Sequence, residues 1–293
     1  HDSMPDPSAW ALRFGGSSYD SVRSLAADSA GNVYVAGSFR GTVHVGPKVL
    51  TSRGESDLAV LKLSPRGEVL WVVTGGGPST CRVSKLQVAP DGDVVVAGHF
   101  LGTAQIAGSP LMAQESGVFV MRLAPDGVVR WVHGSSTSGG RASVGALAVG
   151  PKGHIYVAGL MQGEQRFGTT TIPAIANSHD MYVARVQSSG FVWAKRYRNV
   201  NYLTGMAADA AGNAIFGGAL YETVDFGGVS LSPSGHADAY VVKMNASGNV
   251  DWAKAFGGPG QDAVLSIVAD PGGSARLVGV FESGFKVGAH ALV

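Results

Sequence analysis

The side chains that do chemistry in enzymes are scattered along this chain and form no recognisable catalytic motif. Its eight histidines include no pair at i and i+4, and its single cysteine, Cys81, excludes a cysteine-rich zinc site. No Gly-x-Ser-x-Gly segment marks a hydrolase nucleophile, and the glycine clusters at 75–77 and 139–140 lack the lysine of a phosphate-binding loop. We therefore predict no catalytic residue, no metal site and no cofactor.

Two turns, at 28–32 and 209–213, begin with aspartate and end in Gly-Asn. Aspartate and asparagine oxygens are calcium ligands, but an EF-hand loop has twelve residues and ends in glutamate, which both turns lack. Asp and Asn side chains also hydrogen-bond the backbone of their own turn. We favour this second role.

Four cationic residues recur at one position of a repeated segment: Lys62, Arg122, Arg185 and Lys243. Three of them follow an aspartate by five residues, and those aspartates are Asp57, Asp180 and Asp238. Gly117 stands at that place before Arg122. The fixed offset favours structural ion pairs, and a ring of cations that recruits an anionic ligand is the alternative.

The loops that follow the tryptophan segments differ most from one copy of the pattern to the next. Loops on a rigid scaffold are the usual place for binding residues, and a solvated loop without a ligand is the alternative. We predict binding residues in these loops at Tyr19, Asp20, Arg82, Arg141, Asn201, Tyr202, Gln261 and Asp262.

The elements that must position these loops repeat along the whole chain. Tryptophans recur at Trp10, Trp71, Trp131, Trp193 and Trp252, with spacings of 61, 60, 62 and 59 residues. A fixed period of this length indicates stacked repeats that share one core. Tryptophans can stack on sugars, but a residue that every copy needs favours a packing role.

Each repeat contains short β-branched runs bounded by turns, and no segment keeps helical periodicity. A glycine holds one place in the second run of all five copies: Gly37, Gly98, Gly159, Gly218 and Gly279. Such a glycine favours a bulge or a close backbone approach. A connection near 43–46 and its echoes is interpreted as a short extra hairpin or an ordered loop. Four strands in about 60 residues predict an all-β fold, a β-propeller of four-stranded blades.

The motifs also resemble a known family. The pattern W-x-x-x-F-G-G, then D-x-x-G-N-V-Y-V-A-G-x-F, then D-A-Y-V-V-K, is similar to the SBBP family of bacterial β-propeller repeats, with NHL-type propellers second. It is carried best by residues 10–16, 28–39, 238–243 and 252–258. Ala89, Gly150 and Gly117 depart from it in repeats 2 and 3. The resemblance implies a secreted or cell-surface bacterial protein and names no activity.

We count five copies of the first, second and tryptophan strands and four copies of the third. The sequence therefore predicts one propeller domain at 10–293 with five blades, the fifth lacking one strand, after a leader or added junction at 1–9. Either the native protein continues past Val293 or the ring closes irregularly. A vacant place would expose a strand edge for pairing with another chain.

Charge and composition limit the partners. Basic and acidic residues number 22 and 21, so the chain lacks the cationic excess of nucleic-acid-binding proteins, and no run of 18 apolar residues predicts a membrane span. We expect a non-catalytic scaffold that binds a protein or a glycan through loops on one face. The alternatives are an enzyme, a lyase or hydrolase, and a structural domain of a longer surface protein.

Overall fold

A computed structural model describes residues 10–176, 178–200, 202–270, 273–282, 284–287 and 290–292. These residues form strands, bends and turns and no helix, which confirms the predicted all-β class. They divide into two compact units, with unit 1 ending at Gly134 and unit 2 beginning at Ser135. That both belong to one propeller domain stays a prediction.

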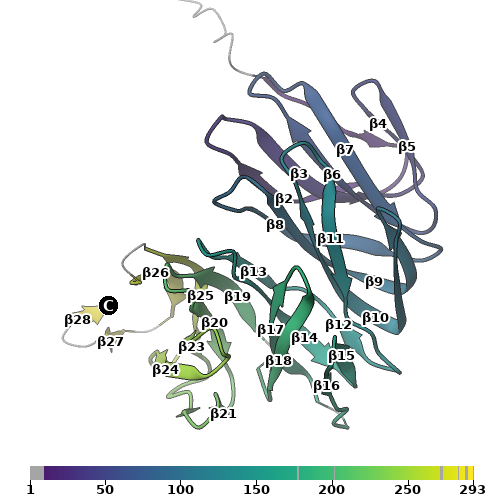
Figure 1. Cartoon of the computed structure of the whole chain (residues 1–293). Coiled ribbons are helices and arrows are strands. Elements are labelled where there is room, and N and C mark those ends of the chain that lie inside the picture. The colour runs from purple at the N-terminus through teal and green to yellow at the C-terminus, as the bar shows by residue number, and fades with distance from the viewer. Residues whose placement is uncertain are drawn as a thin grey trace, which may run out of the picture. The chain divides into compact units, whose positions relative to one another are not determined.

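The main antiparallel sheet of unit 1 has eight strands in two halves of four, drawn in purple to teal in Figure 1, and we call these halves sheet 1 and sheet 2. They are joined where Gly75 pairs with Ile106 and Gly76 with Gln105. Sheet 1 has the order β2 (Ser21–Ala27), β3 (Val33–Phe39), β6 (Asp57–Leu63) and β7 (Val69–Gly76). Sheet 2 has the order β8 (Cys81–Val88), β9 (Val94–Ile106), β10 (Ser109–Leu123) and β11 (Val129–Gly134). The predicted extra hairpin is present as β4 (Thr42–Val45) and β5 (Lys48–Thr51), and β4 pairs with β1 (Gly15–Gly16). Strand order thus follows chain order within each sheet.

Unit 2 repeats this arrangement. Sheet 3 has the order β13 (Ala146–Val149), β14 (Ile155–Gln162), β17 (Asp180–Gln187) and β18 (Gly190–Tyr197), with β12 (Arg141–Ala142) on the end of β14. Sheet 4 has the order β19 (Leu203–Ala208), β20 (Ala214–Leu220), β23 (Asp238–Met244) and β24 (Val250–Phe256). Four hairpin pairs complete the unit: β15 (Gln165–Phe167) with β16 (Thr170–Ile172), β21 (Val224–Asp225) with β22 (Ser230–Leu231), β25 (Asp262–Ala269) with β26 (Ala275–Phe281), and β27 (Phe285–Val287) with β28 (His290–Leu292).

The central strands carry the cores of both units. Every residue of β6 and of β20 is buried, so these strands are covered on both faces and read as continuous apolar runs. In unit 2 the core between sheets 3 and 4 includes Tyr156, Phe216 and Tyr240, each with no exposed surface. The packed sheets give the loops at their ends a rigid support.

The glycine that recurs in the second strand lies against the first strand in all five copies. A Cβ at any of these positions would fall far inside the van der Waals distance of a carbonyl oxygen on or beside that strand. In four copies the first strand also shifts register there, as between Val22 and Ser24. The predicted bulge with close backbone approach is confirmed.

The tryptophans join one repeat to the next. Trp193 Nε1 donates to the carbonyl of Ala246 (3.0 Å), in the turn that connects β23 to β24. A Cβ on Gly248 of that turn would lie 3.1 Å from the Trp193 ring. Trp10 and Trp71 make the same hydrogen bond to the carbonyls of Pro65 and Pro125. The packing role is therefore confirmed for Trp10, Trp71 and Trp193, at the boundary between repeats, where the rings stay partly exposed.

Replacing Trp193 by phenylalanine should lower the free energy of unfolding by about 1–2 kcal/mol. The ring still covers the turn glycine, but the indole hydrogen bond is lost and the carbonyl of Ala246 keeps only its bond from Arg185. Chemical denaturation of the two proteins measures the difference. A loss as large as that of Trp193→Ala would contradict a specific contribution from the hydrogen bond.

The recurring third-strand cations have different partners from those we predicted. Lys243 pairs with Asp209 (2.9 Å) and Lys62 with Asp28 (3.8 Å), both in the turn between the first and second strands. Ion pairs within a repeat are thus present, but the aspartate five residues earlier is not the partner. Each aspartate five residues before a cation is the first residue of its strand. Its carboxylate therefore lies at the end of the sheet opposite to the turn that binds the cation.

Repeats 2 and 3 show how this pair responds to a changed turn. Arg122 bonds Asp93 (Nε to Oδ2, 2.7 Å) and also Asp91. Ala89 stands where the turns of repeats 1, 4 and 5 have their aspartate, so the carboxylates that pair with the cation come from positions further along the turn. In repeat 3 Gly150 replaces the aspartate, and Arg185 instead donates to the carbonyl of Ala246 (3.0 Å). The cation is kept while its acceptor varies, which favours a structural role.

Candidate functional site

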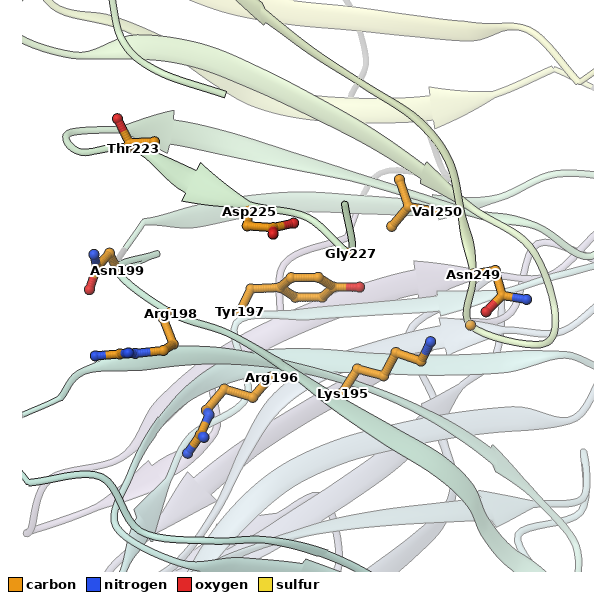
Figure 2. A pocket seen from close by; sticks show the side chains of 11 residues that line it. Lys195, Arg196, Tyr197, Arg198, Asn199, Thr223, Asp225, Gly227, Asn249 and Val250 are labelled. Carbon is orange, nitrogen blue, oxygen red and sulfur yellow. The ribbon is translucent and has the colours of Figure 1, made fainter. Parts of the chain in front are cut away.

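A basic pocket opens on unit 2 where sheets 3 and 4 end. Its volume is about 820 Å³, and it is bounded by the end of β18, the loop after it, the β21 hairpin and the turn before β24. Figure 2 shows the side chains that line it: Lys195, Arg196, Tyr197, Arg198, Asn199, Thr223, Asp225, Asn249 and Val250. Gly227 and Gly248 contribute backbone to its wall.

The floor of this pocket is fixed by aromatic packing. The ring of Tyr197 is 4 % exposed and lies 6.1 Å from the ring of Phe216 and 5.2 Å from that of Phe226. Burial, and then the negative charge of Asp225, raise the pKa of the Tyr197 phenol above its usual value. After β18, Asn199 adopts a φ of 61°, a left-handed conformation that asparagine tolerates.

The three cations of the pocket are not equivalent. Arg196 Nε lies 3.6 Å from Asp180 Oδ2, and its Nη1 donates to the carbonyl of Pro173 (2.6 Å), so this guanidinium has protein partners. Lys195 and Arg198 have no ion pair with a carboxylate among the residues that the structure describes. In Figure 2 their side chains extend to opposite sides of the Tyr197 ring. They provide positive charge that an anionic ligand can use.

The remaining polar groups can bind hydroxyls and amides. Asn199 and Asn249 each carry an amide that both donates and accepts, and Thr223 has a hydroxyl that shares a hydrogen bond with Ser232 (2.8 Å). Asp225 is the one carboxylate among the lining residues, and it accepts from the backbone N–H of Gly228. General acid–base work on a glycoside needs two carboxyl groups, so the arrangement suits binding better than hydrolysis.

In unit 1 the predicted binding residues lie on loops and a strand start. Tyr19 is 68 % exposed. Asp20 accepts from the backbone N–H groups of Gly16 (2.8 Å) and Arg40 (3.2 Å), so its carboxylate shapes its own loop. Arg82 is half-buried on β8. Binding by these three residues stays a prediction.

In unit 2 the predicted residues are separate from the basic pocket, and none of those described lines it. Arg141 is exposed on β12, Tyr202 is partly exposed, and Gln261 donates its backbone N–H to Glu282 (2.9 Å). Asp262 is buried, and Asn201 lies outside the described residues. Their roles in binding also stay predictions.

Sequence reasoning did not select Lys195, Arg198 or Asn199. Arg198 and Asn199 belong to the variable loop 197–202, from which we chose Asn201 and Tyr202. Three cations within 195–198 were a visible signal of a charged site. The contribution of the β21 hairpin and of the turn at 248–250 depends on packing that the sequence does not display.

Two further findings concern the described residues. Among them no group of three or more His, Cys, Asp or Glu side chains is placed to hold a metal ion. The same part of the chain contains no helix with the length and apolarity to span a membrane.

The repeated antiparallel sheets define an all-β repeat protein. Comparison with known families agrees, because residues 9–38 match the family model described as SBBP: Beta-propeller repeat, which confirms the predicted resemblance. An uncharacterized WD repeat-containing protein (L264) of Acanthamoeba polyphaga mimivirus is 24 % identical over 230 residues. The match covers 65 % of this chain and about 16 % of the viral protein's length.

Solved structures show more distant likenesses. A protein of unknown function from Bacteroides caccae aligns over 80 % of this chain and 82 % of its own, with 13 % identity and a TM-score of 0.29. A mutant of the Synechocystis apocarotenoid oxygenase aligns over 85 % and 52 %, with 10 % identity and a TM-score of 0.39. Similarities this weak carry no argument about activity.

Proposed function

We propose that this chain is a non-catalytic binding scaffold whose basic pocket in unit 2 takes an acidic saccharide. The observation that carries the proposal is the pair of cations, Lys195 and Arg198, in a pocket that also presents amide and hydroxyl groups. A volume of about 820 Å³ falls within the range of about 300–1,000 Å³ for small-ligand sites. A carboxylate or sulfate would meet the cations, and sugar hydroxyls would meet Asn199, Asn249 and Thr223.

We place this scaffold in a propeller of five blades, the fifth lacking its third strand. Support comes from the shared strand order of the four sheets and from the β25–β26 hairpin, which matches the first two strands of a sheet. A secreted or cell-surface location in a bacterium also stays a prediction, with the SBBP repeat as its support. An experimental structure of the native protein counts the blades, and fractionation of its source locates it.

Replacing Lys195 or Arg198 by alanine should lower affinity for an acidic saccharide about 10-fold or more. Each loses a charge-assisted hydrogen bond, worth about 1.5–3 kcal/mol. A glycan array of uronic-acid, sulfated and neutral saccharides, probed with the full chain, identifies the ligand, and titration calorimetry then compares the variants. We expect acidic members to bind and their neutral counterparts not to bind.

Lys152→Ala is the matched control, because Lys152 is an exposed cation of unit 2 outside the pocket. It should leave the affinity unchanged. Binding of acidic peptides in place of saccharides would show that the ligand class is wrong. If no acidic ligand binds, or if Lys152→Ala weakens binding as much as the pocket variants do, the pocket is not the site.

A further inference from the structure

Two aspartates of unit 2 form a buried pair away from the basic pocket. Asp238 begins β23 and is 3 % exposed, and Asp262 begins β25 and is 1 % exposed. The point where a Cβ on Gly257 would lie is 2.6 Å from Asp238 Oδ1 and 2.7 Å from Asp262 Oδ2. Both carboxylates therefore lie against Gly257, close to each other.

Each carboxylate has one oxygen bound by the backbone and one without a partner. Asp238 Oδ2 accepts from the N–H (3.1 Å) and the hydroxyl (2.8 Å) of Ser234, and Asp262 Oδ2 accepts from the N–H of Gly258 (2.9 Å). The Oδ1 atom of each is buried and has no hydrogen-bond partner among the described residues. Burying a charged oxygen without a partner is costly, and here two charges of the same sign are buried together.

Other buried aspartates of unit 2 have a cationic side chain. Arg196 lies 3.6 Å from Asp180, and Lys243 lies 2.9 Å from Asp209. Within the described part of the chain no lysine, arginine or histidine makes an ion pair with Asp238 or Asp262. The positive charge that accompanies Asp180 and Asp209 is missing at this pair.

Unit 1 contains the same construction with one change. Asp57 begins β6, its Oδ2 accepts from the N–H of Arg53 (3.1 Å), and its Oδ1 is likewise buried without a hydrogen-bond partner among the described residues. It lies against Gly76 as Asp238 lies against Gly257. Cys81 begins β8, at the place that Asp262 holds in unit 2. Burial, and then the charge of Asp57, raise the pKa of the Cys81 thiol to about 12. A neutral thiol thus replaces the second carboxylate, and this copy has a single negative charge.

We propose that the Asp238–Asp262 pair is a calcium site. Calcium prefers oxygen ligands at about 2.3–2.6 Å, and it accepts carboxylates, backbone carbonyls and water together. The pair offers two carboxylates at the place where the loops 234–237 and 257–260 are hydrogen-bonded to each other, and water would supply the remaining ligands. The ion would neutralise the buried negative charge and would give the unpartnered carboxylate oxygens a partner.

Calcium at this place would also join two repeats. The Ala237 carbonyl accepts from the N–H of Asp262 (2.8 Å), and His236 and Ala237 donate to the carbonyls of Pro259 (3.3 Å) and Gly260 (3.2 Å). These bonds hold the start of β23 beside the start of β25. A shared ion adds a stronger link at the same place, between sheet 4 and the hairpin that follows it.

Titration of the full chain with calcium chloride, after removal of divalent ions with EGTA, tests the site. We expect one equivalent to bind by calorimetry. The thermal unfolding midpoint should rise by about 5–10 °C when free calcium is about 100 times Kd. Asp262→Asn and Asp238→Asn should each weaken calcium binding about 10-fold or more, since even the outer partners of a metal site change affinity 10–100-fold.

Asp57→Asn is the matched control, because it alters the same position in the copy that has one carboxylate. It should leave the calcium affinity and stoichiometry unchanged. Absence of binding and of any midpoint shift in the unmodified chain overturns the proposal, whatever the variants do. An equal loss of calcium binding in Asp57→Asn also overturns it, because it indicates binding at the surface. So does an unfolding midpoint that does not change with calcium and rises on acidification, because it indicates that the two carboxylates share a proton.

Discussion

Replacing Asp209 by asparagine should lower the free energy of unfolding at pH 7 by about 3–5 kcal/mol. Asp209 is 1 % exposed and accepts from the N–H (2.8 Å) and the side-chain amide (2.8 Å) of Asn213, besides its pair with Lys243. Removing its charge leaves the Lys243 ammonium half-buried beside a neutral amide. Losing one member of a buried pair costs far more than the intact pair contributes. Urea denaturation of both proteins measures the difference.

The deficit of this variant should depend on pH. Burial alone would raise the pKa of Asp209, but the hydrogen bonds from Lys243 and Asn213 outweigh it and lower the pKa below its usual value. A lowered pKa in the folded state stabilises the protein above the usual aspartate pKa of about 3.9, and this contribution is lost as the pH falls through the lower, folded value. The wild-type protein should therefore lose its advantage over Asp209→Asn below about pH 4.

Asp270 offers the control for this prediction. It holds the corresponding turn position of the last repeat, where it pairs with Arg276 at 3.0 Å, but the Arg276 side chain is 76 % exposed. Exposed pairs contribute about 0–1 kcal/mol, so Asp270→Asn should cost less than about 1 kcal/mol. Equal losses in the two variants would contradict the view that burial of the pair sets its importance.

Replacing Gly159 by alanine should destabilise the protein by about 2–4 kcal/mol. The added Cβ would fall deep inside the van der Waals distance of the Ser143 carbonyl oxygen and 3.1 Å from the backbone nitrogen of Gly145. These are backbone atoms that pair with β14 through the bonds from Ser143 and Gly145 to Leu160 and Ala158, so the strand must move. Overpacking of this kind costs about 1–3 kcal/mol, and more where backbone must shift.

Gly145→Ala tests whether that loss is specific to the close approach. Gly145 belongs to the same region of sheet 3, but its Cβ would meet Leu203 at 3.6 Å, an ordinary contact. The free energy of unfolding should change by less than about 1 kcal/mol. Part of the change is stabilising, because alanine restricts the unfolded chain more than glycine does. A thermal melt of each variant makes the comparison. Similar losses at both positions would indicate general intolerance of this segment.

The repeat made much of the fold predictable. A glycine recurs inside the second strand of all five copies. This predicted a close backbone approach, because a strand position that another backbone approaches closely has no room for a side chain. Gly159 lies against Ser143 in this way. The short β-branched runs predicted strands, and the structure has strands there, among them the fully buried β6 and β20. In each case several copies of one short pattern gave the same local answer.

Contacts between segments were harder to predict. Lys243 follows Asp238 by five residues, but residues at odd spacing in a strand point to opposite faces, and the partner is Asp209 in a neighbouring turn. The basic pocket was missed for the same reason. Lys195 and Asn249 meet only because sheets 3 and 4 pack together, and no spacing in the sequence reports that packing.

The tryptophan contact has a consequence for cooperativity. Trp71 belongs to sheet 1, yet its indole N–H is satisfied by Pro125 and its ring rests on Gly127, both in the β10–β11 turn of sheet 2. Trp193 bears the same relation to Ala246 of sheet 4. This contact is lost whichever of the two sheets opens locally, so opening one sheet weakens the sheet that shares the tryptophan contact with it. Amide hydrogen exchange should therefore be coupled between sheets 1 and 2 and between sheets 3 and 4.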